Sequence, residues 1–184
     1  LIALLILLQF NFLTILLGLS SMLLAFSYPF MKRITYWPQL FLGLTFNWGI
    51  IMGWTSLINN ISMEPIILYL SAIFWTLGYD TIYGVQDIKD DEIIGVKSTS
   101  IKFKNNIKIF VGACYTLCVF FILTLFFMVE INKYLLIMSL FFIISLVYQL
   151  KIFKVNNSNS CLLAFRINNL TGIFVLIFIL SFAL

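Results

Sequence analysis

Residues 107–129, IKIFVGACYTLCVFFILTLFFMV, form an unbroken apolar run that carries a single charge, Lys108. Runs of about 18 or more apolar residues are typical of transmembrane helices. Apolar residues follow one another here instead of alternating with polar ones, which favours a helix over a strand of a membrane barrel. Because lipid offers backbone groups no hydrogen-bond partners, we expect this segment to cross a bilayer as a helix.

The rest of the chain repeats this pattern. Of its 184 residues 62% are hydrophobic, and the mean hydropathy is +1.10, whereas a soluble domain is about 45–50% apolar. We expect the tail of one span at Leu1–Leu8 and then six complete spans, the first of them ended by Pro29. The six are Asn11–Tyr28, Pro38–Leu57, Pro65–Tyr83, Ile107–Val129, Tyr134–Leu150 and Cys161–Leu184. No Gly/Ser linker or low-complexity block divides them, so the sequence predicts one all-α, polytopic transmembrane domain over residues 1–184.

The chain opens at Leu1, inside an apolar run, and we interpret it as N-terminally incomplete. That run has no basic n-region and no small-residue cleavage site, which argues against a signal peptide. The three cysteines, Cys114, Cys118 and Cys161, form no CxxC pair, and the chain has no histidine. Zinc sites, haem sites and histidine-based catalysis are therefore disfavoured, and we expect the cysteines to be packing residues.

Basic residues gather in every second connection between the expected spans. Ten of the eleven lie there, and only Lys133 lies on the other side, with Glu64 and Glu130. The ten are Lys32, Arg33, Lys89, Lys97, Lys102, Lys104, Lys108, Lys151, Lys154 and Arg166. The positive-inside rule makes their side cytoplasmic and puts the C-terminus on the far side. The net charge of +4 then reflects topology and lipid-headgroup contact, not nucleic-acid binding.

One stretch at the basic side, YDTIYGVQDIKDDEIIGVKS at residues 79–98, holds five of the seven acidic residues. An aspartate at bilayer depth costs about 2.5–3.5 kcal/mol, so the cluster is either a solvated loop or functional. If the third span continues as a helix past Tyr83, then Asp80, Asp87 and Asp91 fall within roughly 40° of one another on one face. Gly84 weakens that helix by about 1 kcal/mol relative to alanine.

A stripe of carboxylates repels itself unless a cation lies on it. Mg²⁺ prefers oxygen ligands and commonly bridges a carboxylate to a phosphate, so a DxxxD pair suggests a diphosphate bound through Mg²⁺. Ca²⁺ or Mn²⁺ fits these ligands nearly as well, and from physics alone the solvated loop stays an equal alternative. Lys97, Lys32 and Arg33 are candidates to hold phosphate oxygens directly.

Three stretches resemble one family of membrane enzymes. YDTIYGVQDIKDDEIIGVKST, from residue 79, resembles the second aspartate-rich motif of the UbiA-type membrane prenyltransferases, YDTxYAxxDxxDDxxxGxKS, with Gly84 where alanine is common. YPFMKRITYWPQLFLGLTFNWGIIMG at 28–53 resembles a segment of the 4-hydroxybenzoate polyprenyltransferase branch, and AFRINNLTG at 164–172 is similar to the AFxxNNxxG of the last helix in that branch. The three occur in the expected order, and the resemblance covers essentially the whole chain.

The resemblance implies a fold and a reaction. The family fold is a bundle of nine transmembrane helices around a central cavity, with two aspartate-rich motifs at the cytoplasmic side, of which this chain contains only the second. The implied reaction is the Mg²⁺-dependent transfer of a polyprenyl group from polyprenyl diphosphate to 4-hydroxybenzoate, in ubiquinone biosynthesis. The implied location is the bacterial inner membrane, or alternatively the mitochondrial inner membrane. Oligomeric state and prenyl chain length are not implied.

The resemblance also carries roles to individual residues. The expected metal ligands are Asp87 and Asp91, the catalytic candidates are Asp80, Tyr83 and Lys97, and the substrate-binding candidates are Lys32, Arg33, Asn168 and Asn169. Plain alternatives exist: Tyr83 as a membrane-interface tyrosine, Lys32 and Arg33 as topology signals, and the asparagines as interhelical hydrogen-bonding residues. Asp90 points away from the other aspartates and is as well explained by solvation.

The residues alone are compatible with three other functional interpretations. One is a UbiA-type enzyme with another aromatic acceptor, and a second is a cation-coupled membrane transporter whose acidic residues bind the ion. A third is an inactive remnant, against which the intact charges of the aspartate-rich motif argue mildly.

Overall fold

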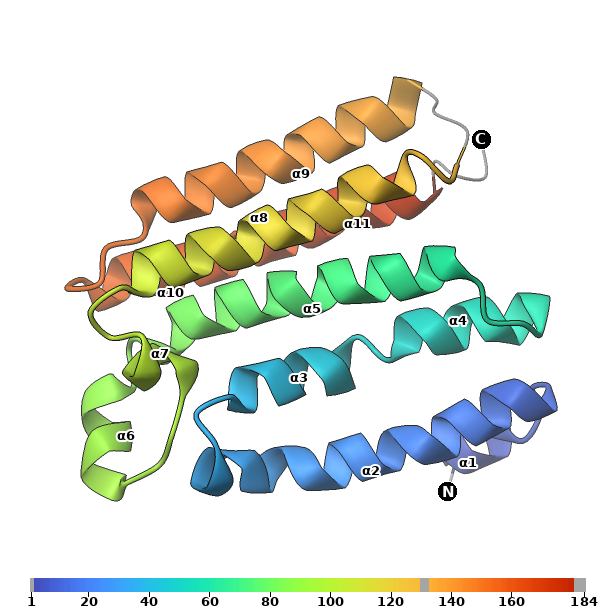
Figure 1. The fold of residues 1–184 in the computed structure, drawn as a ribbon, viewed down its shortest axis with the longest axis horizontal. Coiled ribbons are helices and arrows are strands. Elements are labelled where there is room, and N and C mark those ends of the chain that lie inside the picture. The colour runs from blue at the N-terminus through green and yellow to red at the C-terminus, as the bar shows by residue number, and fades with distance from the viewer. Residues whose placement is uncertain (1, 130–132, 181–184) are drawn as a thin grey trace.

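The computed structural model describes residues 2–129 and 133–180, and the regular elements there are all α-helices (Figure 1). In chain order they are α1 (Ile2–Leu7), α2 (Phe12–Ile34), α3 (Pro38–Phe46), α4 (Gly49–Ile58), α5 (Met63–Gly84), α6 (Ile88–Ile94), α7 (Thr99–Lys102), α8 (Ile107–Leu125), α9 (Lys133–Ile152), α10 (Ser158–Arg166) and α11 (Asn168–Leu180). Six segments are long and apolar enough to cross a membrane, which confirms the expected bundle. Glu130 and the end of the last expected span, residues 181–184, lie outside the described residues.

Helix α5 is the centre of the bundle. It packs against α8 on one side and against α3 and α4 on the other, as Figure 1 shows, while α7 and α10 contact it near its C-terminal end. Buried side chains form two clusters around it. The larger joins α5 to α8–α11 and includes Ile82, Val111 and Phe178, and the smaller contains Ile51, Tyr69 and Ile73. The three cysteines are buried and free, as expected for packing residues.

The expected end of the first span at Pro29 is wrong, because α2 runs through this proline to Ile34. A proline inside a helix removes one hydrogen bond, but membrane helices tolerate it where the surroundings compensate. The last turn of α2 is closed by the Thr35 N–H, which donates to the Met31 carbonyl at 2.9 Å. Lys32 and Arg33 therefore lie on the final helical turn instead of in a loop.

Two of the six spans are interrupted. Between α3 and α4, Asn47 donates from Nδ2 to the Gly43 carbonyl and to the Thr76 hydroxyl, each at 2.8 Å, and the Trp48 indole donates to the Leu17 carbonyl at 3.0 Å. These bonds satisfy groups that lipid cannot and tie the interruption to α5 and α2. The second interruption, at Ile167, separates α10 from α11.

The third span ends one residue after its expected bound at Tyr83, so Asp80 and the later aspartates do not lie on one continuous helix. Helix α5 ends at Gly84, and α6 starts at Ile88 and lies across the end of the bundle, as Figure 1 shows. A Cβ on Gly84 would lie 2.6 Å from the Ser100 hydroxyl oxygen, so the absent side chain lets α7 dock against the end of α5. Gly95, at φ 79°, then ends α6 in the left-handed region that glycine adopts at no steric cost.

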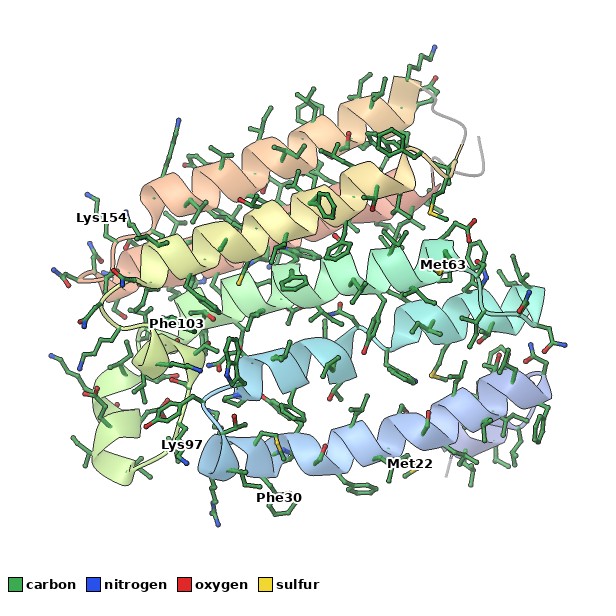
Figure 2. The ribbon with its side chains drawn as sticks, in the orientation of Figure 1. Met22, Phe30, Met63, Lys97, Phe103 and Lys154 are labelled. Atoms are coloured by element: carbon green, nitrogen blue, oxygen red, sulfur yellow. The ribbon has the colours of Figure 1, made fainter. Side chains whose placement is uncertain are left out.

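The charge segregation expected from the sequence is confirmed. Figure 1 shows the end of α2, the helices α6 and α7, and the α9–α10 connection together at one end of the bundle. Figure 2 places Lys97, Phe103 and Lys154 at this end, with Met63 at the opposite one. We call the first the basic end and the second the far end.

Candidate functional site

A small pocket of about 120 Å³ lies at the basic end, where α2, α3, α5 and α6 meet. We call it the acidic pocket. Its lining residues are Tyr28, Lys32, Pro38, Gln39, Asp80, Tyr83, Gly84, Asp87 and Asp91. Three carboxylates that the sequence places over twelve positions therefore face one space, although they belong to different structural elements.

Local helix geometry explains this convergence. Tyr28 and Lys32 are four residues apart in α2, and Asp80 and Gly84 are four residues apart in α5, so each pair shares a helix face. Asp87 is the N-cap of α6 but makes no side-chain capping hydrogen bond, which leaves its carboxylate available. The Asp91 N–H donates to the Asp87 carbonyl at 2.8 Å, so the first turn of α6 holds these two side chains together.

The pocket is rich in uncompensated negative charge. Three carboxylates face one ammonium group, that of Lys32. Within residues 2–129 and 133–180 the only ion pair joins Lys104 to Glu92, outside the pocket. Burial raises the pKa of Asp91, the Lys32 ammonium opposes that shift, and the carboxylates of Asp87 and Asp90 add to it. The arrangement is therefore complementary to a cation.

The donor set fits Mg²⁺ that is shared with a phosphate. In the described part of the chain, no three acidic or sulfur side chains stand close enough to form a metal cage by themselves. Mg²⁺ does not need one, because it usually keeps several waters and takes one or two carboxylates together with substrate phosphates. Asp87 and Asp91, one helical turn apart, are suited to be that pair.

The structure brings together five of the residues singled out from the sequence: Lys32, Asp80, Tyr83, Asp87 and Asp91. Asp90 is exposed outside the pocket. Sequence reasoning missed Tyr28 and Gln39 as pocket residues. A signal for Tyr28 existed, because it precedes Lys32 by one helical turn, but it was hidden by the expected helix end at Pro29. For Gln39 the sequence offers only its place beside Pro38.

Two basic candidates lie outside the lining. The Lys97 ammonium donates to the Ile34 carbonyl at 3.1 Å and lies 5.6 Å from the centre of the Tyr36 ring. Its backbone N–H donates to the Lys32 carbonyl at 2.7 Å, so Lys97 anchors the segment after α6 to the end of α2. Arg33 is exposed beside Lys32 and does not line the pocket.

Asn168 belongs to a buried polar network. Its Oδ1 accepts from the Trp75 indole at 3.0 Å and from the Gln149 amide at 3.2 Å. Gln149 also accepts from the Tyr115 hydroxyl at 2.6 Å and donates to Thr171 at 3.0 Å. The network joins α5, α8, α9 and α11, so Asn168 has an interhelical bonding role. Its neighbour Asn169 is exposed.

An aromatic row connects the pocket to the bundle interior. The Tyr83 ring lies 4.7 Å from the Phe165 ring, and Tyr79 lies between Phe165 and Trp75 at centroid distances of 5.9 and 5.7 Å. Helix α10 is thus packed against the part of α5 that carries Asp80.

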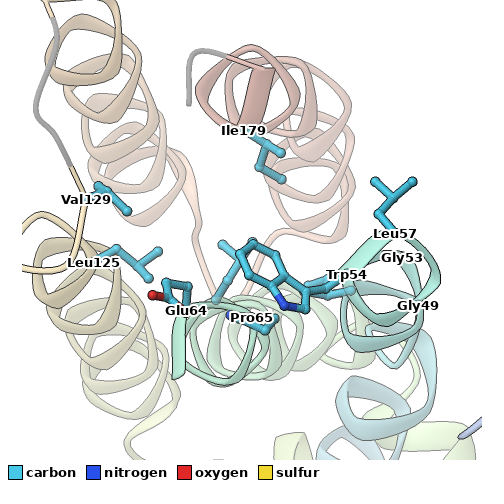
Figure 3. Close-up of a pocket in the computed structure, with 11 residues that line it drawn as sticks. Gly49, Gly53, Trp54, Leu57, Glu64, Pro65, Leu125, Val129 and Ile179 are labelled. Carbon is cyan, nitrogen blue, oxygen red and sulfur yellow. The ribbon is translucent and has the colours of Figure 1, made fainter. Parts of the chain in front are cut away.

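A larger and mostly apolar cavity of about 830 Å³ lies toward the far end (Figure 3). It is lined from α4, α5, α8, the segment after α8, and α11 by Gly49, Ile50, Gly53, Trp54, Leu57, Glu64, Pro65, Leu68, Leu125, Val129 and Ile179. Two buried polar atoms of its wall, Trp54 Nε1 and Glu64 Oε2, have no hydrogen-bond partner among the described residues. Figure 3 shows Trp54 beside Pro65 at the floor of this space.

Comparison with known proteins places these features in context. The sequence matches the UbiA prenyltransferase family over residues 1–180. It is 55% identical over 105 residues to the mitochondrial 4-hydroxybenzoate polyprenyltransferase of Arabidopsis thaliana and 52% identical over 106 residues to that of Homo sapiens. Each match covers 56% of this chain but only 26% and 28% of those proteins, so the matched region is about a quarter of the length of these relatives.

A solved structure shares the fold. The apo structure of a UbiA homolog from Aeropyrum pernix K1 superposes with a TM-score of 0.74 at 18% sequence identity. The superposition covers 92% of this chain and 65% of that one. At this identity the similarity shows the helical arrangement alone.

Proposed function

The chain belongs to the UbiA prenyltransferase family, and on that premise we propose that it forms part of a 4-hydroxybenzoate polyprenyltransferase of ubiquinone biosynthesis. The observation that carries the proposal is the acidic pocket. Lys32, Asp80, Tyr83, Asp87 and Asp91 come from α2, α5 and the start of α6, match the family pattern, and face one space. The high identity to curated 4-hydroxybenzoate polyprenyltransferases supports that acceptor over other aromatic compounds.

In this proposal the acidic pocket binds the diphosphate of the polyprenyl donor. Asp87 and Asp91 would hold Mg²⁺, and the chemistry that the ion would supply is stabilisation of negative charge on the diphosphate leaving group. Lys32 donates to phosphate oxygens from the side of α2. Asp80 orients Lys32 or the substrate, and Tyr83 lines the same space from α5.

The proposed reaction is a substitution on the aromatic ring of 4-hydroxybenzoate. The bond between C1 of the prenyl group and the diphosphate oxygen breaks, and the electron pair leaves with the diphosphate. A bond then forms between C1 and the ring carbon ortho to the hydroxyl of 4-hydroxybenzoate, and that carbon loses its proton to solvent or a basic group. The aromatic row of Tyr83, Phe165, Tyr79 and Trp75 borders the path of the allylic cation and keeps water away from it.

The apolar cavity at the far end suits the isoprenoid tail. Glu64 and Asp80 are sixteen positions apart on α5, which corresponds to about 24 Å along the helix. A tail that extends from the acidic pocket along α5 reaches apolar walls from α4, α8 and α11. The basic end then faces the cytoplasm of a bacterium or the matrix of a mitochondrion, in agreement with the positive-inside rule. The relatives named above are mitochondrial proteins.

The test compares Asp87→Asn with Asp90→Asn in membranes that contain the complete protein. Both changes remove one negative charge from α6, but only Asp87 lines the pocket. With polyprenyl diphosphate, radiolabelled 4-hydroxybenzoate and Mg²⁺, we expect lipid-soluble label from wild type and Asp90→Asn. We expect at least a hundredfold less from Asp87→Asn, and none in EDTA.

Each result distinguishes between alternative assignments of the site or of the acceptor. Equal loss in both variants would remove the special role of the pocket. Label that persists in Asp87→Asn would retain the enzyme and reject this metal ligand. Absence of label from wild type, with label from another aromatic acceptor, would move the proposal to that acceptor.

A further inference from the structure

Gln39 borders the acidic pocket but has no part in the function proposed above. It follows Pro38 in the first turn of α3, and only 5% of its surface is exposed. A polar side chain buried to this degree normally has its hydrogen bonds satisfied, because a buried group without a partner loses the hydrogen bonds that it made to water. Its hydrogen-bond partners therefore show what the residue is suited to do.

One end of the Gln39 amide is fixed by the protein. The Thr99 N–H donates to Gln39 Oε1 at 3.0 Å, and only the carbonyl oxygen of an amide can accept this bond. The amide nitrogen must then point the other way. It lies 3.4 Å from the position that a Cβ on Gly84 would occupy, and Gly84 is itself a lining residue. Within the described part of the chain, Gln39 Nε2 donates no hydrogen bond to protein.

The partner that fixes Gln39 is itself rigidly held. The hydroxyls of Thr99 and Thr81 are hydrogen-bonded at 2.7 Å, and the Ser100 hydroxyl donates to the Thr81 carbonyl at 2.8 Å. All three residues are buried. Helix α7 is therefore locked to the end of α5, and the Gln39 amide is oriented before any ligand arrives.

The pocket offers a diphosphate few hydrogen-bond donors. Among three carboxylates it has one ammonium group, from Lys32, and the hydroxyl-bearing side chains of Tyr28 and Tyr83, so a further donor strengthens binding. An amide N–H supplies a donor without a charge, and it does not compete with Lys32 for the carboxylates as a second cation would. Its preorganisation reduces the entropy cost of binding.

We propose that Gln39 is a diphosphate-binding residue, which donates a hydrogen bond from Nε2 to a non-bridging oxygen of the prenyl diphosphate while Thr99 holds Oε1. The inference rests on the proposed function, because it requires a diphosphate in the acidic pocket. It adds a neutral donor from α3 to a site otherwise built from α2, α5 and α6.

The test measures binding of inorganic pyrophosphate to the purified complete protein in Mg²⁺, by isothermal titration calorimetry. Gln39→Glu keeps the oxygen that accepts from Thr99 but replaces the donor with an acceptor. Gln39→Met has similar length and no donor or added charge. A hydrogen bond to a charged group contributes about 1.5–3 kcal/mol, so we expect a Kd increase of about tenfold or more in both variants. The KM for 4-hydroxybenzoate should change less than twofold.

Two control variants separate this role from charge and from folding. Gln86→Glu makes the same charge change one residue before Asp87 but outside the pocket lining, so its Kd should stay within about threefold of wild type. Thr99→Val keeps the backbone N–H that holds Gln39 Oε1 and removes only the hydroxyl bond to Thr81, so it should lower stability and raise the Kd much less than the Gln39 variants do. Both Gln39 variants are compared with these after size-exclusion chromatography confirms a folded protein.

The outcomes separate the role of Gln39 from the proposed function. If the wild type binds pyrophosphate and Gln39→Met and Gln39→Glu bind it with the same Kd, the role of Gln39 is overturned and the proposed function stays intact. A loss in Gln39→Glu alone, matched by Gln86→Glu, would assign the effect to charge and also overturn the role. Absence of pyrophosphate binding to wild type would overturn the proposed function and this inference with it.

Discussion

The contact between α5 and α8 at Gly78 offers a sharp test of the fold that supports the site. Gly78 is buried two residues before Asp80. A Cβ at this position would clash with Tyr115 Cε1 and would lie 2.8 Å from Tyr115 Cδ1. Optimal carbon contacts are about 3.5–4.0 Å, so in Gly78→Ala the tyrosine ring must retreat by about 1 Å.

The ring has little freedom to retreat. Tyr115 is 3% exposed, and its hydroxyl donates to Gln149 at 2.6 Å. Overpacking of this kind costs about 1–3 kcal/mol, and losing the buried hydrogen bond costs about 1–3 kcal/mol more. Replacing a helical glycine by alanine returns about 1 kcal/mol. We expect a net loss of about 3 kcal/mol in the free energy of unfolding, which lowers Tm by roughly 6–12 °C.

The assay is thermal unfolding of the complete protein in detergent, with Gly112→Ala as the matched control. Gly112 lies in α8, and a Cβ there would have no neighbour within 4 Å. The control should be neutral or slightly stabilised. Tyr115→Leu, which shortens the side chain, should recover part of the loss when combined with Gly78→Ala. If Gly78→Ala and Gly112→Ala have the same Tm, the packing of α5 on α8 is not as described.

Two further predictions concern the polar groups of the bundle. Gln149→Leu should cost about 1–3 kcal/mol of stability, because it leaves the buried Tyr115 hydroxyl without its acceptor, and Tyr115→Phe in the same chain should recover most of this loss in thermal unfolding. Asp91→Asn should abolish prenyl transfer yet stabilise the metal-free protein at neutral pH. Because the folded-state pKa of Asp91 is raised, its ionisation opposes folding above that pKa, and the opposition disappears as the pH falls through it. The difference in Tm from wild type should therefore shrink on acidification, and a constant difference would contradict this account.

Much of the architecture could be predicted from the sequence because its signals are local. A continuous apolar run such as residues 107–129 has one stable solution in lipid, a helix, whatever lies beside it. Basic connections report which ends of the helices lie together, because each span crosses the membrane once. The aspartate-rich stretch likewise identified Asp80, Asp87 and Asp91 as a group before any contact was known.

The wrong prediction of a helix end at Pro29 arose because packing against other helices can override a local sequence preference. Pro29 is a helix breaker in isolation, yet α2 continues past it, and only this continuation puts Lys32 on the face that Tyr28 shares. Helix α5 ends at Gly84, where the absent side chain leaves room for Ser100 of α7, and α6 starts at Ile88. The three aspartates still meet, but from two helices instead of one.

The order of residues along the chain was enough to predict a membrane-spanning helical bundle with a group of carboxylates at its basic end. Hydropathy and charge act on each segment separately, so the spans and their orientation can be predicted from the linear sequence. The groups that share the pocket with those carboxylates became known from the packing of the helices. Gln39 is separated from Thr99 by sixty positions, and its orientation depends on a bond between them that no local pattern specifies. Side-chain direction at such a site is set by packing between helices that are distant in the chain, and that packing exists only in three dimensions.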